Sequence, residues 1–238
     1  MVDLELVLAV DVSESMSRAE LLSQRLGYVA ALRHADFAGA VATRGGVAIT
    51  YMEWAGANDQ KIIVPWTVVS DAKAAESFAS RLDAAPLRPD FGSAAWNTGT
   101  SISHALLFAA GMFNNSLSSR VIDISGDGPN NAGPFLGPVR DRVVAEGITI
   151  NGLPIPARGG LNPPFPLDAY YEDCVIGGPG AFVLAVGEPD EFAAAVRRKM
   201  ILEIAGPLPR FMLAGFELKT EPRIDCAAAE AAVRPASG

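Results

Sequence analysis

The sequence is poor in positive charge. Its 19 lysines and arginines are outnumbered by 27 aspartates and glutamates, which gives a net charge of −8 at pH 7. Nucleic-acid phosphates are bound through clustered Lys and Arg side chains, so this composition argues against a nucleic-acid partner. The one basic cluster, Arg197-Arg198-Lys199, falls in a predicted helix that also carries Glu191 and Glu203. We expect this cluster to form a solvated helix face.

Long apolar runs are also missing. The longest candidate, Leu4 to Val10, contains Glu5, whereas a membrane-spanning helix needs about 18 or more apolar residues. The sequence therefore predicts no membrane span. Half of the 238 residues are hydrophobic, which is enough to form a full core in one large domain or two small ones.

Cysteine and histidine are scarce. The two cysteines, Cys174 and Cys226, fit either one disulfide formed in an oxidising compartment or two separate buried thiols. The histidines are His34 and His104, and the Gly-x-Ser-x-Gly turn of many serine hydrolases is absent. Although Ser101 stands close to His104 in the sequence, we expect a structural role for this histidine.

The most informative stretch that is present is Asp11-Val12-Ser13-Glu14-Ser15, directly after the apolar run Leu4 to Val10. This run predicts a buried strand. Side chains two residues apart point the same way in extended chain, so Asp11, Ser13 and Ser15 can converge on one point. All three offer oxygen, which suits a hard cation such as Mg²⁺, Mn²⁺ or Ca²⁺.

Two later segments place similar side chains next to predicted elements. One runs from Asn97 to Ser103 and precedes a helical stretch; the other, Val121 to Gly128, is a short apolar strand that ends in Asp127 between two glycines. Asp123 lies inside that strand. We interpret it as a buried, hydrogen-bonded residue that supports the loops rather than as a ligand.

Together these segments resemble the metal-ion-dependent adhesion site of von Willebrand factor A (VWA) domains. That site reads Asp-x-Ser-x-Ser, then a distant Thr, then a more distant Asp. Thr100 matches better than Thr98, because in the family the Thr lies five residues before an Ala-Leu-like pair, here Ala105-Leu106. Matched residue by residue, the resemblance implies these metal ligands: Asp11, Ser13, Ser15, Thr100 and Asp127.

Further stretches are similar to a bacterial branch of VWA proteins that is labelled domain of unknown function 1194. The likeness covers about residues 3–205. It is carried by Tyr51 to Gly56, Val64 to Thr67, Ser125 to Asn131, Asn151 to Ile155 and Val175 to Phe182. One departure is Glu14, where many VWA proteins have Gly between the two serines. Its side chain would add negative charge at the rim of the site.

Alternating strands and helices predict a mostly parallel sheet covered on both faces. The predicted strands are 4–10, 47–54, 61–68, 120–125, 148–153 and 181–186, and the predicted helices are 17–33, 71–84, 101–113, 138–146 and 189–205. In the first helix, Leu21, Leu22, Leu26 and Val29 are spaced for one buried face. Residues 154–180 are predicted to form a long surface loop.

The predicted fold class is therefore a single α/β domain. It is a three-layer αβα sandwich with a doubly wound, mostly parallel sheet and one antiparallel edge strand, as in VWA domains. We expect the VWA-like domain to span residues 3–205. Residues 206–238 would be a C-terminal tail, held, if at all, by Cys226.

The resemblance implies binding rather than catalysis. We expect one divalent cation, Mg²⁺ before Mn²⁺ or Ca²⁺, and a protein partner that supplies an Asp or Glu carboxylate. It also implies a periplasmic or secreted protein, with a leader ahead of Met1. Two alternatives stay open from the sequence: a metal-assisted hydrolase that uses His104 or Glu14, and a domain whose metal is purely structural.

Overall fold

The fold is seen in a computed structural model of the chain, which describes residues 2–87, 99–113, 118–156, 163–186, 192–206 and 222–234. Five strands form one sheet in the order β3-β2-β1-β4-β5. They are β1 Leu4–Asp11, β2 Val47–Trp54, β3 Gln60–Val69, β4 Ser119–Gly126 and β5 Ile148–Pro154. β1 pairs in parallel with β2 and β4, and β4 pairs in parallel with β5, whereas β3 runs antiparallel at the edge.

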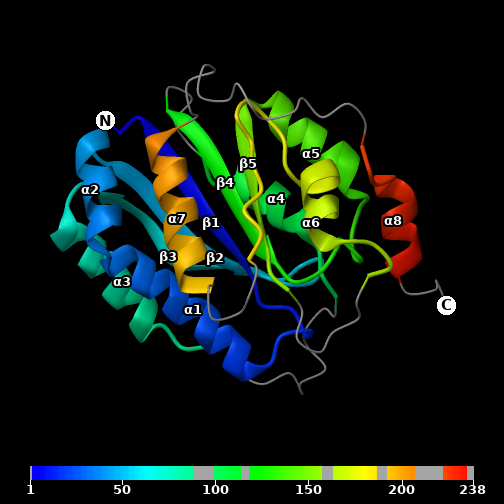
Figure 1. Cartoon of the computed structure of the whole chain (residues 1–238), viewed down its shortest axis with the longest axis horizontal. Helices are drawn as coiled ribbons and strands as arrows, with labels where there is room; N and C mark the ends of the chain where they lie inside the picture. Colours follow the sequence, from blue (N-terminus) through cyan, green and yellow to red (C-terminus); the bar gives the residue numbers. More distant parts are fainter. Residues whose placement is uncertain are drawn as a thin grey trace.

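Helices cover both faces of this sheet (Figure 1). α1 Arg18–Arg33, α2 Ala35–Arg44, α3 Ala72–Ala84 and α7 Phe192–Ala205 lie on one side. The other side carries α4 Ile102–Ala110, α5 Leu136–Ala145, α6 Leu167–Tyr170, the π-helix η1 Tyr171–Val175 and α8 Cys226–Val233. The predicted three-layer fold with one antiparallel edge strand is thus confirmed.

The alternation of β1 explains the two layers. Leu6, Leu8 and Val10 enter the hydrophobic cluster beneath α1, α2, α3 and α7, and Val7 and Ala9 enter the cluster on the opposite face. Neighbours on both sides of β1 leave its backbone fully paired. After β1 the chain crosses over to β2 on one side, and later to β4 on the other side of β1. In parallel sheets the loops at the carboxyl ends of the strands form a crevice at this point of reversal.

Two sequence predictions about burial are wrong. Leu22 and Leu26 are 45% and 46% exposed and line a surface hollow beside Phe192 of α7, whereas Tyr28 and Val29 of the same helix are buried. Lys199 and Glu203 are fully buried rather than solvated. Both belong to the face of α7 that packs against the sheet.

Two predictions about the later chain are also wrong. The segment 181–186 forms no strand; it lies beside β5 with a bridge between Val183 and Gly152 and a bond from the Val186 N–H to the Pro154 carbonyl at 3.4 Å. The Asn151 side chain accepts the Phe182 N–H at 3.1 Å, which takes the place of a backbone ladder bond there. The stretch predicted as one long loop contains α6 and η1, whose Tyr170 and Tyr171 are buried.

The two cysteines form a disulfide between η1 and α8, with the Cα atoms of Cys174 and Cys226 5.5 Å apart. Of the two possibilities that the sequence left open, pairing is therefore the one observed. Among the described helices, none is long and apolar enough to cross a membrane.

Candidate metal site at the carboxyl ends of β1 and β4

Asp11 is the last residue of β1, and local hydrogen bonds shape the turn that follows it. Its Oδ1 accepts the backbone N–H of Ser13 at 2.7 Å, an arrangement that Asp favours in turns. Asp11 and Ser13 are buried, whereas Ser15 is exposed. The predicted site therefore runs from a buried carboxylate to a hydroxyl at the protein surface.

Helix α1 begins directly after this turn. Ser17 and Glu20 form the predicted capping box, with the Ser17 N–H donating to Glu20 Oε2 at 2.8 Å and the Glu20 N–H donating to Ser17 Oγ at 3.3 Å. From the second turn of the helix, Gln24 Nε2 donates to the Asp11 carbonyl at 2.8 Å. These bonds tie the turn both to its strand and to its helix.

The five residues implied by the resemblance lie together. Ser15 Oγ donates to Asp127 Oδ1 at 2.8 Å, and Ser13 Oγ lies 3.0 Å from Ser15 Oγ. Thr100 Oγ1 donates to Ser13 Oγ at 3.5 Å. Asp127 directly follows β4, and Thr100 lies two residues before α4. Thr98, the alternative threonine, lies outside the described residues.

Two asparagines that the sequence analysis did not single out support this site. Asn131 Oδ1 accepts the Thr100 N–H at 2.7 Å, and the Asn131 N–H donates to the Thr100 carbonyl at 2.9 Å. Asn130 Oδ1 accepts the Ser103 N–H at 3.1 Å. Gly99 has φ +102, and a Cβ there would meet Asn131 Oδ1 at 2.8 Å. Glycine is therefore required next to the two hydrogen bonds between Asn131 and Thr100. In the sequence, the feature that could have identified these two residues is the Asn-Asn pair in the loop after Asp127.

The electrostatics of the site call for positive charge. Burial, and then the charge of nearby Asp127, raise the pKa of the Asp11 carboxyl to about 8. Burial also raises the pKa of Asp127 above its ordinary value. Asp11 Oδ2 is buried and accepts no hydrogen bond from the described residues. A cation is the group that would favour both ionised carboxylates here.

The donor set also defines the kind of cation. Across the part of the chain that the structure describes, no three His, Cys, Asp or Glu side chains gather as metal ligands. The site instead combines two carboxylates with three hydroxyls, all oxygen. Hard divalent ions take such ligands and keep waters in the remaining positions. The residues present thus fit a divalent cation.

Tyr171 is a further residue at the site that the sequence analysis missed. It is fully buried, and its hydroxyl has no hydrogen-bond partner among the described residues. A Cβ on Gly126 would lie 2.8 Å from both Tyr171 Oη and Asp11 Oδ2. Both oxygens therefore pack against Gly126, where any larger residue would clash with them.

The serine and histidine considered for hydrolysis form a different arrangement. His104 Nδ1 lies 2.8 Å from Ser101 Oγ, which donates to the Ala132 carbonyl at 3.0 Å and accepts the His104 N–H as the N-cap of α4. Ser101 is fully buried. Its hydroxyl is therefore part of a helix cap and is not open to a substrate, which supports the structural interpretation of His104.

Solved structures of other proteins share this fold. A von Willebrand factor type A protein from Catenulispora acidiphila is 12% identical, with a TM-score of 0.58, and the match covers 86% of this chain and 43% of that one. The pilus adhesin SpaC from Lactobacillus rhamnosus GG is 13% identical, with a TM-score of 0.60 and coverage of 84% and 30%. Proximal thread matrix protein 1 from the mussel byssus, with a zinc-occupied MIDAS motif, is 12% identical, with a TM-score of 0.54 and coverage of 84% and 46%.

The chain thus spans less than half the length of each of these proteins, and the likeness establishes a VWA-like fold. A search of curated proteins gave no match. A family model described as protein of unknown function DUF1194 matches residues 1–208. The chain belongs to this family, as the resemblance in the sequence implied.

Proposed function

We propose that this VWA-like protein is a divalent-cation-dependent protein-binding module of the adhesion type, and not an enzyme. The observation that carries the proposal is a cluster of five oxygen-bearing side chains, one of which is the buried Asp11 carboxylate with an oxygen that has no partner among the described residues. Among proteins with this fold, one is described as a pilus adhesin and another holds zinc in its MIDAS motif.

The residues that would hold the cation are Asp11, Ser13, Ser15, Thr100 and Asp127. Mg²⁺ is favoured because few carboxylates, several hydroxyls and retained waters suit octahedral coordination. When bound, the cation would supply a Lewis-acidic position for an incoming oxygen ligand. Since Ser15 is exposed while Asp11 is buried, that ligand would approach from the Ser15 side.

A carboxylate from a partner protein suits this position. The chain supplies only two carboxylates to the site, so a divalent ion held by them would keep affinity for a further anion. Glu14 is exposed between the two serines, and its charge would oppose such a ligand. The partner is therefore expected to present an Asp or Glu at the centre of its contact surface.

The disulfide supports a location outside the cytoplasm. Such bonds persist in oxidising compartments and are rare where thiols are kept reduced. We propose a periplasmic or secreted protein. Cell fractionation, combined with alkylation in the absence of reductant, tests this: the protein should be exported and should carry no alkylated cysteine.

Calorimetry with Mg²⁺ and Mn²⁺ tests the metal ligands. Asp11→Ala should abolish binding of one ion per chain, and Thr100→Val should weaken it. Asp83→Ala and Thr43→Val are matched controls, because both remove exposed side chains of helices remote from the site. Unchanged affinity in Asp11→Ala, with the fold intact, would rule out the site.

Partner capture tests the function itself. The wild-type protein, used as bait in Mg²⁺ and in EDTA, should retain a partner only with the metal, and the Asp11→Ala bait should retain none. Acidic residues of that partner are then neutralised singly. Binding that survives both chelation and every acidic substitution would refute the adhesion-type mechanism while leaving a structural metal in place.

A further inference from the structure

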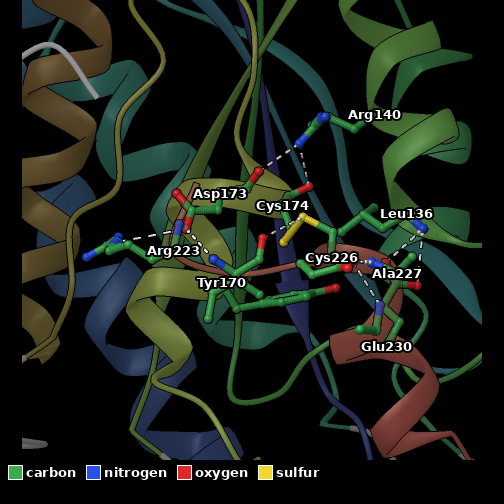
Figure 2. Close-up of a disulfide and its surroundings, with 12 residues drawn as sticks. Leu136, Arg140, Tyr170, Asp173, Cys174, Arg223, Cys226, Ala227 and Glu230 are labelled. Atoms are coloured by element: carbon green, nitrogen blue, oxygen red, sulfur yellow. Dashed lines mark hydrogen bonds and ion pairs between the residues drawn. A yellow bond between two sulfur atoms is a disulfide. The ribbon is translucent and has the colours of Figure 1, made fainter. Parts of the chain in front are cut away.

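The disulfide joins two short segments that both reach the loops of the candidate metal site. Cys174 belongs to η1, which also carries Tyr171, and Cys226 is the first residue of α8, which carries Glu230 (Figure 2). Neither segment supplies a proposed ligand. α8 bonds to Asn130, a residue that supports the ligands, and Tyr171 of η1 lies near the ligand Asp11 itself.

The first connection runs through Glu230, which is 1% exposed. Its Oε2 accepts Asn130 Nδ2 at 2.8 Å, and its Oε1 accepts the Leu136 N–H at 3.1 Å. α5 has no side-chain cap of its own at Phe135, so the carboxylate of α8 caps it instead. Figure 2 shows Glu230 directed from α8 toward the N-terminus of α5.

Asn130 links Glu230 to the segment that carries Thr100. While its amide nitrogen donates to Glu230, its Oδ1 accepts the Ser103 N–H at 3.1 Å. The adjacent Asn131 binds both the N–H and the carbonyl of Thr100. The loop between Asp127 and α5 is thus held by α8 at one end and holds the Thr100 segment at the other.

The second connection is Tyr171, three residues before Cys174. Its buried hydroxyl packs against Gly126, as does Asp11 Oδ2, and neither oxygen has a hydrogen-bond partner among the described residues. The phenol makes no hydrogen bond to the Asp11 carboxylate, but it lies beside Gly126 together with Asp11 Oδ2 and thus limits the positions that the carboxylate can take. Partners of this kind, which contact ligands rather than the metal, commonly change metal affinity by about 10–100-fold.

The disulfide is the covalent bond that holds α8 in place beside η1. α8 has only eight residues, and helices this short are marginal without outside contacts. Besides Glu230, the segment is held through Asp173, whose Oδ2 accepts the N–H groups of Arg223 and Ile224 at 2.7 and 3.1 Å. Asp173 adjoins Cys174, so these bonds and the disulfide anchor α8 at one point.

We propose that the Cys174–Cys226 disulfide supports the metal site through Glu230, Asn130 and Tyr171, so that reducing the disulfide weakens metal binding. This inference rests on the proposed function, since it assumes that the five residues bind a cation. Cys226 is only half-buried, whereas Cys174 is fully buried, so a reductant reaches the bond from the Cys226 side. A dithiol breaks the Sγ–Sγ bond by giving two electrons and two protons; two cysteine thiols form, and the dithiol is oxidised to its own disulfide.

The test compares the Mn²⁺ affinity of three forms of the full chain by calorimetry. The first is the oxidised protein, the second is protein reduced with a dithiol, alkylated and freed of the reagent, and the third is the Cys174→Ser/Cys226→Ser variant. We expect the affinity to fall about tenfold in the last two forms. In oxidised protein, Glu230→Ala and Tyr171→Phe should each weaken binding with the disulfide intact. Glu76→Ala on the exposed surface of α3 is the control.

Near-UV circular dichroism reports whether each form is folded. If loss of the disulfide unfolds the protein, Glu230→Ala and Tyr171→Phe decide the question, because they keep the bond. Glu230→Gln, which retains one acceptor oxygen, should lose less affinity than Glu230→Ala. Affinity equal to wild type in a folded disulfide-free form, or in both Glu230→Ala and Tyr171→Phe, would overturn the inference. Failure of oxidised wild type to bind Mn²⁺ would instead overturn the proposed function.

Discussion

Two pairs of buried carboxylates in this protein solve the same electrostatic problem in different ways. Asp123 on β4 and Glu203 on α7 enclose Lys199, whose Nζ lies 2.5 Å from both Asp123 Oδ1 and Glu203 Oε1. Asp11 and Asp127 lie at the ends of β1 and β4, and Asp11 Oδ2 has no partner among the described residues. The first pair has a cation from the chain itself, and the second is left to take one from solution.

The contrast is sharp because Asp123 and Asp127 are only four residues apart. Lys199 is completely buried, with its ammonium 5.2 Å from the centre of the Phe182 ring, and Asn151 Nδ2 donates to Glu203 at 3.2 Å. The side chains of that closed cluster are buried and leave no exposed side for an ion from solution. The site at Asp127 adjoins the exposed Ser15. Buried carboxylates therefore indicate a metal-binding site only where no Lys or Arg of the chain neutralises them.

Removing the internal cation should have the largest effect. Lys199→Met would leave two buried carboxyls without their ammonium group, and breaking a buried ion pair in this way costs about 3–5 kcal/mol. Urea unfolding in EDTA measures the loss. Arg198→Met, which removes an exposed charge from the same helix, should change the free energy of unfolding little. Equal effects of the two substitutions would contradict the account of the closed cluster.

Metal should stabilise the open pair by the next largest amount. Mg²⁺ at 100 times its dissociation constant should raise the free energy of unfolding by about 2.7 kcal/mol, since only the folded chain binds it. Asp127→Ala should remove this increase, and Glu203→Gln should keep it. Thermal unfolding in Mg²⁺ and in EDTA gives both values. A metal effect of the same size in Asp127→Ala would show that the ion binds elsewhere.

The closed cluster should also make stability depend on pH. Burial, aided by the charge of Asp123, raises the pKa of Glu203 from 4.5 to about 8. The folded chain then binds more protons than the unfolded chain between these values, so its free energy of unfolding falls as the pH rises from about 4.5 to about 8. Glu203→Gln should reduce this slope, measured by urea unfolding in EDTA, and leave the part that belongs to Asp11, whose pKa burial also raises to about 8. An unchanged slope would mean that Glu203 does not titrate in this range.

These clusters also show what a sequence can and cannot predict. Asp11, Ser13 and Ser15 are close in the chain, and the turn directly after β1 brings them together, so the local sequence pattern was enough to group them. The patterns of Thr100 and Asp127 at element boundaries pointed to the same edge of the sheet. The order of strands and helices predicted the layers for the same reason. Each of these signals is local.

The residues that were missed depend on contacts between distant segments. Lys199 looked solvated because its neighbours Arg197 and Arg198 are charged, and only the packing of α7 on β4 explains its burial. Glu230, in an Ala-rich stretch, caps a helix 94 residues earlier in the chain. Leu22 and Leu26 were misplaced because helical spacing defines a stripe along the helix but does not decide how much of that stripe its neighbours cover.

Glu14 offers the smallest test. Its exposed charge at the rim should oppose an incoming carboxylate, so Glu14→Gly should strengthen partner binding by roughly 0.2–1 kcal/mol, the range of exposed charge interactions. The gain should shrink as salt is raised, because exposed charges are screened. Partner titrations at low and high salt measure it. Weaker binding in Glu14→Gly would show that Glu14 contacts the partner favourably.

The most direct measurement compares the two aspartates of β4 and its loop. Asp127→Asn and Asp123→Asn remove one negative charge each, four residues apart, and nearly preserve side-chain volume. Calorimetry with Mg²⁺ should show that Asp127→Asn has lost binding while Asp123→Asn binds one ion with wild-type affinity. If folded Asp127→Asn binds Mg²⁺ as tightly as wild type, the open carboxylate pair is not the metal site.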